Sequence, residues 1–230
     1  MSGAGSPGAS AARPGSGLFL AFEGVEGSGK STQARLLGER LRAAGIDVIV
    51  AREPGSTPLG ERIRQLVLEE RGLGIPARSE LFLMLAARAA FVEQVVAPAL
   101  AEGKVVIADR FELSTLAYQG AGRGLPLDEI IRSNQLATGG IRPDATILLE
   151  LEPEEGVRRQ AAAAKEPDRM EREAREFHHR VARGYRDLAD RVEGLIRIDG
   201  SGSIEAVRGR VESALRERFP ETFRSGRFIS

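Results

Sequence analysis

Short apolar runs alternate with longer stretches of mixed polarity along this chain. The runs occupy residues 18–22, 47–50, 104–108, 145–149 and 195–198. Most of them lack a polar residue at every second position, which is typical of strands buried on both faces of a parallel sheet. The stretches between them predict helices at 30–44, 58–70, 78–101, 127–138, 154–160, 168–192 and 204–219. This order predicts an α/β fold, a five-stranded parallel sheet with helices on both faces.

Three of the predicted helices are followed by a glycine that precedes a strand. These residues are Gly45, Gly103 and Gly194. Glycine is favoured just past a helix end because it adopts the left-handed backbone conformation without strain. The three glycines therefore predict where the helices before the second, third and fifth strands end.

We expect one domain over residues 18–220, with a tail on each side of it. Residues 1–17 are nearly all Gly, Ala, Ser and Pro, with Arg13 as the only charge. Such a segment buries too little apolar surface to offset the entropy of ordering, so we expect a disordered tail, and a second tail at 221–230. No apolar stretch resembles a secretory signal or a membrane span.

Composition narrows the function classes. The 230 residues are 42% hydrophobic, which suits one domain with a substantial core. Lys+Arg and Asp+Glu balance at 33 each, so we expect neither nucleic acid nor a membrane as a partner, and any anion site must be local. Cysteine is absent, and the adjacent His178 and His179 would point about 100° apart on a helix, which excludes a shared metal. We expect a cytoplasmic enzyme.

The segment from Gly24 to Ser31 matches the pattern G-x-x-x-x-G-K-[ST], between a predicted strand and a predicted helix. Its glycines let backbone N–H groups surround phosphate oxygens, and the helix N-terminus adds partial positive charge. Lys30 is expected to bridge the β- and γ-phosphates, and the Ser31 hydroxyl to hold Mg²⁺. The segment predicts ATP or GTP binding, by Gly24, Val25, Glu26, Gly27, Ser28, Gly29, Lys30, Ser31 and Thr32.

The rest of the chain favours a kinase over other nucleotide-binding proteins. A GTPase requires an Asn-Lys-x-Asp motif, but the only asparagine, Asn134, is followed by Gln135. A motor ATPase usually has an acidic pair after its second motif strand, whereas here the strand at 104–108 is followed by Asp109 and Arg110. Asp109 can orient Mg²⁺ and Arg110 suits a second phosphate, although a surface ion pair is the alternative.

A kinase that acts on a monophosphate must hold two polyanions together and therefore needs several cations. Its acceptor phosphate is already ionised, so a strong general base is not required. Arg52 and Glu53 follow the second strand, where loops face ligands in α/β sheets. Arg88 interrupts an apolar helix, so it needs a partner or water, unless it simply reaches solvent.

Several motifs together resemble bacterial thymidylate kinases. They are residues 22–33, 52–57, 109–111, Ser114, 117–120 and the Asp-Arg-hydrophobic-Glu stretch at 168–171, and the match runs from about Leu18 to Leu215. The resemblance implies a three-layer P-loop kinase fold with a small lid at about 156–168. It implies transfer of the γ-phosphate of ATP to dTMP, which gives dTDP and ADP in nucleotide biosynthesis, with Mg²⁺ as cofactor. It also implies a homodimer.

The resemblance further implies roles for individual residues. The residues expected near dTMP or Mg²⁺ are Arg88 and Arg110 at the phosphate with Arg52 nearby, Glu26 at the 3′-hydroxyl, Ser114 and Gln119 at the thymine edge, Tyr118 against a 2′-hydroxyl, and Glu53 and Asp109 around Mg²⁺. Tyr118 as a core aromatic residue is the alternative.

Two departures from the family pattern bear on selectivity and catalysis. Met84 stands where an aromatic residue commonly stacks on thymine, and methionine contacts a base less rigidly. The phosphate-binding loop has no arginine, so we expect the lid to supply a catalytic cation, Lys165 or Arg159, with Arg169 following. A kinase for another pyrimidine acceptor and an inactive nucleotide-binding regulatory module stay open as alternatives.

Overall fold

The computed structural model describes residues 17–70, 72–162 and 168–223. Its five strands are β1 (Leu18–Glu23), β2 (Val48–Arg52), β3 (Val105–Asp109), β4 (Ala145–Glu150) and β5 (Leu195–Asp199). They form one sheet in the order β2-β3-β1-β4-β5, and every neighbouring pair is parallel. The structure therefore confirms the predicted five-stranded parallel sheet.

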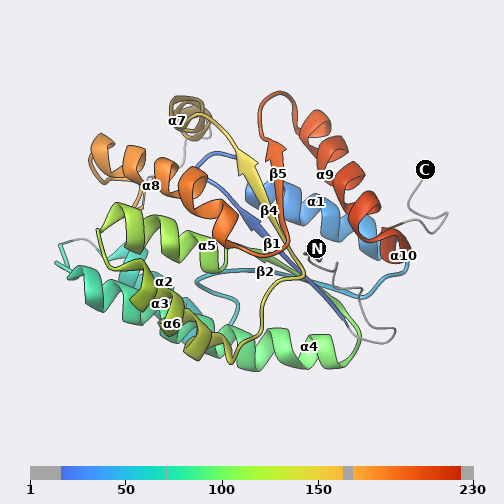
Figure 1. The fold of residues 1–230 in the computed structure, drawn as a ribbon, viewed down its shortest axis with the longest axis horizontal. Coiled ribbons are helices and arrows are strands. Elements are labelled where there is room, and N and C mark those ends of the chain that lie inside the picture. The colour runs from blue at the N-terminus through green and yellow to red at the C-terminus, as the bar shows by residue number, and fades with distance from the viewer. Residues whose placement is uncertain (1–16, 71, 163–167, 224–230) are drawn as a thin grey trace, which may run out of the picture.

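Helices cover both faces of this sheet, which gives three layers (Figure 1). On one face, α1 (Lys30–Ala43), α9 (Ile204–Arg218) and α10 (Pro220–Phe223) share a core with the inward side chains of β1. On the other face lie α2 (Pro58–Arg64), η1 (Gln65–Glu69), α3 (Ala77–Phe91), η2 (Val92–Val96), α4 (Ala97–Ala101), α5 (Glu112–Thr115), η3 (Leu116–Gly122), α6 (Leu127–Thr138), α8 (Arg175–Leu188) and η4 (Ala189–Arg191), with α7 (Pro153–Ala162) above the sheet.

The sequence of β1 explains its central place. All six of its residues are buried, because alternate side chains enter the core on opposite faces. Leu18, Leu20 and Phe22 pack toward α1 and α9, whereas Phe19 and Ala21 pack toward α3, η2 and α4, the helices before β3. A polar residue inside this strand would have no water on either side, so the pattern admits only apolar residues until Glu23 at its end.

The predicted helix ends agree with the structure at Gly45 and Gly103, which directly follow the C-cap residues of α1 and α4. Before β5 the last helical segment ends at Arg191, and Gly194 lies in a turn after it. Gly45, Gly103 and Gly194 have φ angles of 79°, 75° and 69°, in the left-handed region. One prediction is wrong at its start: the helix expected from 168 begins at Arg175, because residues 168–174 form turns. The apolar pattern also did not predict the helical segment 112–122, formed by α5 and η3.

The predicted C-terminal boundary is too early. Residues 220–223 form α10, and the Phe223 side chain is fully buried in the core beside Phe219. The domain therefore extends through Phe223. The predicted N-terminal tail, apart from Gly17, and residues 224–230 lie outside the described residues.

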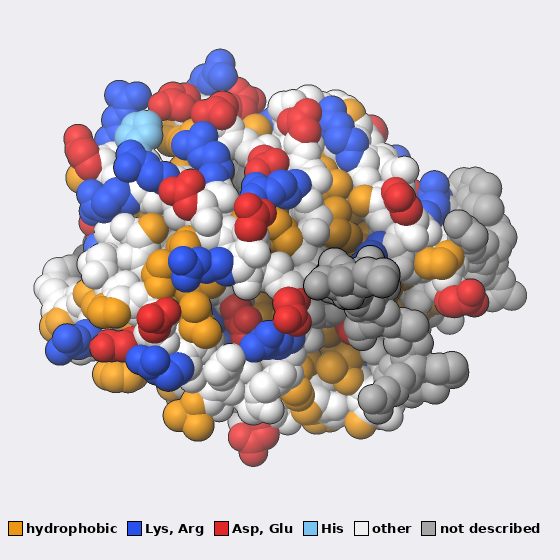
Figure 2. All heavy atoms as spheres, viewed as in Figure 1, with side chains coloured by type: hydrophobic (Ala, Val, Ile, Leu, Met, Phe, Trp, Pro, Cys, Tyr) orange, Lys and Arg blue, Asp and Glu red, His pale blue; other side chains and the backbone are white. Residues whose placement is uncertain are grey.

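The continuous helical run Ala77–Ala101 is, within the described ranges, long and apolar enough to cross a membrane by length and composition alone. It belongs to the core instead, since Leu81, Leu85 and Phe91 are buried against the rest of the protein. It also carries the buried charges of Glu80 and Arg88, which are paired inside the protein. On the face in Figure 2, acidic and basic side chains are mixed rather than separated by sign.

Candidate active site

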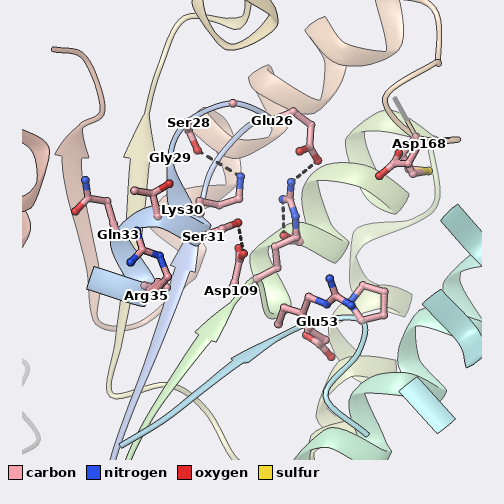
Figure 3. Close-up of a pocket in the computed structure, with 18 of the residues that line it drawn as sticks. Glu26, Ser28, Gly29, Lys30, Ser31, Gln33, Arg35, Glu53, Asp109 and Asp168 are labelled. Atoms are coloured by element: carbon pink, nitrogen blue, oxygen red, sulfur yellow. Dashed lines mark hydrogen bonds and ion pairs between the residues drawn. The ribbon is translucent and has the colours of Figure 1, made fainter. Parts of the chain in front are cut away.

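A pocket of about 1100 Å³ opens at the carboxyl ends of β1, β2 and β3. Residues of the β1–α1 loop, the β2–α2 loop and the end of β3 line it, together with side chains from α3 and η3. In parallel sheets, ligands bind at this edge, where the connections leave in opposite directions. Figure 3 shows the loop side chains directed toward this space.

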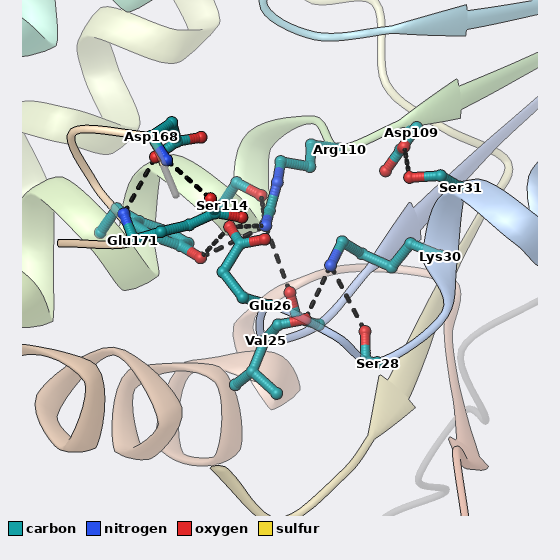
Figure 4. Close-up of polar contacts among 12 residues, drawn as sticks. Val25, Glu26, Ser28, Lys30, Ser31, Asp109, Arg110, Ser114, Asp168 and Glu171 are labelled. Carbon is teal, nitrogen blue, oxygen red and sulfur yellow. Dashed lines mark hydrogen bonds and ion pairs between the residues drawn. The ribbon is translucent and has the colours of Figure 1, made fainter. Parts of the chain in front are cut away.

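The β1–α1 loop curls around its own lysine. Gly27 and Gly29 have φ angles of 72° and 93°, which glycine adopts without strain. The Lys30 ammonium donates hydrogen bonds to the Val25 carbonyl oxygen at 2.7 Å and to Ser28 Oγ at 3.3 Å (Figure 4). Burial, and then repulsion by Arg110, lower the pKa of Lys30 to about 8. A bound polyanion would relieve both effects, so the loop is built to receive phosphates.

A hydroxyl and a carboxylate meet beside this lysine. Ser31 Oγ, in the first turn of α1, donates a hydrogen bond to Asp109 Oδ2 at the end of β3. The register of the sheet brings them together, since Phe22 pairs with Asp109 and the loop returns after Glu23. Magnesium is usually held by one or two such oxygens plus substrate phosphates and water, so this pair fits Mg²⁺. No group of three or more His, Asp or Glu side chains suited to a metal occurs within residues 17–70, 72–162 and 168–223.

Arg110 lies at the centre of a second polar cluster. Its guanidinium pairs with the Glu26 carboxylate and donates to Tyr185 Oη at 2.9 Å and Ser114 Oγ at 3.1 Å. Tyr118 Oη donates to Glu26 Oε1 at 2.8 Å, and burial raises the pKa of Tyr118, which keeps this hydroxyl protonated. Arg110 has a φ of 76°, an uncommon conformation for a residue other than glycine, which directs it back over the loop.

The carboxylate of Glu23 positions this cluster from below. Glu23 is fully buried and accepts hydrogen bonds from the backbone N–H groups of Phe111 at 2.7 Å and Ser114 at 3.0 Å. It also accepts from Ser114 Oγ and Tyr185 Oη. The N-terminal N–H groups of α5 thus have an acceptor, and Ser114 is fixed toward Arg110. Sequence reasoning missed Glu23 and Tyr185; the polar residue at the end of an apolar strand was the available signal.

Arg88 is committed to protein acceptors, which changes the role predicted for it. Its Nε and Nη2 atoms bond Glu53, Nη1 bonds Thr115 and Asn134, and Nη2 also bonds the Phe111 carbonyl. All five N–H groups are therefore used. Arg88 lies in the pocket wall, but the phosphate contact expected of it is not preformed in this structure.

The ion pair between Arg88 and Glu53 holds Glu53 apart from the expected Mg²⁺ ligands Ser31 and Asp109. Both Glu53 carboxylate oxygens accept from Arg88, at 2.8–3.0 Å. Burial raises the pKa of Glu53, against the opposing effect of Arg88. In Figure 3, Glu53 is directed away from Ser31 and Asp109. The metal role predicted for Glu53 is therefore not supported, because its charge is already neutralised inside the protein.

The remaining residues predicted near the acceptor line the same pocket. Arg52, half exposed, forms an ion pair with Glu61 at 3.1 Å, and Met84 contributes an apolar wall. Gln119 is buried and its side-chain amide donates to Glu80 Oε1 at 2.9 Å. The structure thus brings together Glu26, Arg52, Met84, Arg110, Ser114, Tyr118 and Gln119.

Helix α7, where the lid is predicted to begin, packs directly on the phosphate-binding loop. A Cβ atom added to Gly27 would lie 2.3 Å from the Gly156 carbonyl oxygen. Arg159 of α7 lines the pocket and donates to Glu155 Oε1 at 3.0 Å and to the Gly200 carbonyl at 3.1 Å. The other predicted lid cation, Lys165, lies outside the described residues.

Comparisons with known proteins agree with this site. The sequence profile described as thymidylate kinase matches residues 22–211. The thymidylate kinase of Symbiobacterium thermophilum is 43% identical over 208 residues, 90% of this chain and 96% of its own length. Those of Synechococcus sp. (strain JA-2-3B'a(2-13)) and Pseudomonas putida (strain GB-1) are 47% and 45% identical, over 88% and 87% of this chain and 96% and 95% of their own lengths. Since the profile match spans both the phosphate-binding loop and the Arg110 cluster, and these relatives match over most of their length, the chain belongs to the thymidylate kinase family.

Proposed function

We propose that Lys30 binds the ATP phosphates and that Arg110 binds the dTMP phosphate. This enzyme phosphorylates dTMP to dTDP with ATP. The observation that carries the proposal is that two cations, Lys30 of the loop and Arg110 after β3, line one pocket; burial, and then repulsion by Arg110, lower the pKa of Lys30. Cations that repel each other across a pocket are stabilised when anions bind between them. ATP phosphates lie on the loop 24–31, and the dTMP phosphate lies against Arg110.

On the donor side, Lys30 exchanges its bonds to Val25 and Ser28 for bonds to ATP phosphates. Ser31 and Asp109 would hold Mg²⁺, and the ion would supply positive charge to the ATP phosphates. A lid cation, Arg159 or Lys165, stabilises the charge that develops on the transferring group, because the loop itself supplies no arginine.

On the acceptor side, the Arg110 guanidinium exchanges its ion pair with Glu26 for one with the dTMP phosphate. The Glu26 carboxylate then accepts a hydrogen bond from the sugar 3′-hydroxyl. Tyr118 borders the sugar, and its bond to Glu26 supports the place we assign it beside the 2′ position. Ser114 and Gln119 face the thymine edge, and Met84 contacts the base through its polarizable side chain. The acceptor phosphate attacks as an anion, so positioning and charge stabilisation carry the catalysis.

A panel of monophosphate acceptors in a coupled ADP-release assay tests this assignment. We expect dTMP to give the highest kcat/KM, ahead of dUMP and CMP. A higher value with dUMP or CMP would assign the site to another pyrimidine, and absence of turnover with every acceptor would favour a regulatory nucleotide-binding module.

We also propose a cytoplasmic homodimer. The Phe82 side chain on α3 is 63% exposed and that of Leu136 on α6 is 86% exposed, and these two helices pack against each other. Association would remove both large apolar side chains from water. A monomer in light scattering at micromolar concentration would contradict the dimer.

A further inference from the structure

A buried carboxylate outside the pocket joins the acceptor site to the segment that follows the lid. Glu80, in the first turn of α3, has no exposed surface and is absent from the residues that line the pocket. It accepts hydrogen bonds from Gln119 Nε2 at 2.9 Å and from Arg123 at 3.0 and 3.1 Å, and forms an ion pair with Arg169. Side chains from two separate segments, the end of η3 and the turn at Arg169, therefore converge on this carboxylate of α3.

Two arginines carry the connection from Glu80 to the segment 168–173. Arg169 also donates from Nε to the Val67 carbonyl at 2.6 Å, and its backbone N–H donates to the Leu68 carbonyl at 2.9 Å. Arg123 bonds Glu173 at 2.6 Å as well as Glu80. The segment is thus attached at its start to α3 and η1 through Arg169, and at its end to Arg123 through Glu173. Burial raises the pKa of Glu80, but the arginine hydrogen bonds outweigh it and hold that pKa below its ordinary value.

The attached segment itself forms part of the pocket wall. Asp168, Met170 and Glu171 line the pocket, where Figure 4 shows Asp168 and Glu171. Asp168 and Glu171 each accept a hydrogen bond from the other's backbone N–H, at 2.9 and 2.8 Å. Glu171 also accepts from Gln160 of α7 at 2.6 Å. These hydrogen bonds close the turn, and Arg169 attaches it to α3 and η1.

Glu80 also contacts a residue of the proposed dTMP site. Its carboxylate orients the side-chain amide of Gln119, which lines the pocket. Met84 lies four residues later on α3, on the same side of the helix one turn on. A shift of Glu80 would therefore move the base wall and the post-lid turn together.

We propose that Glu80 is a positioning residue that acts through Arg169 and Gln119 to hold the post-lid turn and the base wall at the separation that dTMP requires. Arg169, which sequence reasoning considered as a lid cation, serves in this account as an anchor. Its donors go to Glu80 and to the Val67 carbonyl, so it acts on the reaction through the position of Asp168 and Met170.

Glu80→Gln tests this role because the side chain keeps its size and loses its charge. We expect kcat/KM for dTMP to fall about tenfold or more, since misplacement of about 1 Å can cost up to ~100-fold, while the Kd of ATP stays within about twofold. The matched control is Glu212→Gln. Glu212 is also buried and paired with arginines, Arg40 and Arg216, but on the opposite face of the sheet. Loss of the Glu212 charge should lower Tm and leave both kcat/KM for dTMP and the Kd of ATP unchanged.

The double variant Glu80→Gln/Arg169→Gln distinguishes positioning from general weakening. If Glu80 acts through Arg169, the two losses in kcat/KM for dTMP do not multiply. If Glu80→Gln does not fold, Arg169→Lys keeps the charge, loses the planar fork and should give the same selective loss. Multiplicative losses, parallel changes in the ATP and dTMP constants, or a kcat/KM for dTMP within about twofold of wild type would each overturn the proposal.

Discussion

Gly27 of the phosphate-binding loop and Gly156 of helix α7 approach so closely that neither position has room for a Cβ atom. A Cβ at Gly156 would lie 2.3 Å from the Glu26 carbonyl oxygen, and one at Gly27 would lie 2.3 Å from the Gly156 carbonyl oxygen. Real Cβ atoms do not approach backbone oxygens at this distance. The start of the predicted lid therefore rests on the loop that binds phosphate, backbone against backbone.

Gly156→Ala should displace α7 from this loop and lower kcat by about tenfold, since catalysis depends on donor geometry. Gly209→Ala on α9 is the matched control, because an added Cβ there has nothing within 4 Å. Both changes improve helix propensity by ~0.5–1 kcal/mol. Only Gly209→Ala should raise Tm with unaltered turnover. Equal kinetics for the two variants would show that the close contact does not affect the reaction.

Lys30 predicts a pH dependence of ATP binding. Its pKa in the free enzyme is about 8, and bound phosphates raise it. The stabilisation of the complex by charged Lys30 is therefore complete below pH 8 and is lost as pH rises toward the pKa in the complex. Calorimetry should show proton uptake on ATP binding above pH 8, with Kd weakening by up to about tenfold per pH unit. A constant Kd from pH 7.5 to 9.5 would contradict the assignment.

Tyr118 predicts the enzyme's choice of sugar. If its ring fills the space that a 2′-hydroxyl would occupy, Tyr118→Ala should narrow the ratio of kcat/KM for dTMP over its ribonucleotide counterpart. Tyr118→Phe keeps the ring and loses the hydrogen bond to Glu26, so it should retain most of that ratio. A Tyr118→Ala variant with the wild-type ratio would assign Tyr118 to the core.

Arg158 and Arg159 are neighbours on α7 with different surroundings. Arg158 is 75% exposed and pairs with Glu155, whereas Arg159 lines the large pocket and bonds the Gly200 carbonyl. Arg159→Ala should lower kcat about tenfold or more if it stabilises the transferring phosphoryl group, and Arg158→Ala should stay within about twofold. If neither variant loses turnover, Arg159 is not the lid cation, and Lys165 stays as the candidate.

Much of the fold could be predicted because its signals are local. The strand β1 is apolar on both faces, and the eight residues from Gly24 carry a pattern whose chemistry requires that spacing. Asp109 was predictable for the same reason, since it follows a buried strand at the edge where ligands bind. Each of these inferences needs only neighbouring residues.

Pairings between distant segments could not be predicted. The chain indicated that Arg88 needs a partner, but the choice of Glu53, 35 residues away, depends on how α3 packs beside β2. In the sequence, Glu80 cannot be distinguished from an ordinary helix residue, because its partners Arg123 and Arg169 are distant along the chain. The burial of Phe223 likewise depends on its contact with a core assembled from strands far along the chain.

Isothermal titration of each substrate against Lys30→Gln and Arg110→Gln tests most directly whether these two cations serve different phosphates. A charge-assisted hydrogen bond contributes ~1.5–3 kcal/mol, so each loss should weaken one substrate by about tenfold or more. We predict that Lys30→Gln weakens ATP and leaves dTMP within about twofold, and that Arg110→Gln does the reverse. Equal weakening of both substrates by either variant, or the opposite pairing, would contradict the division of the pocket between donor and acceptor.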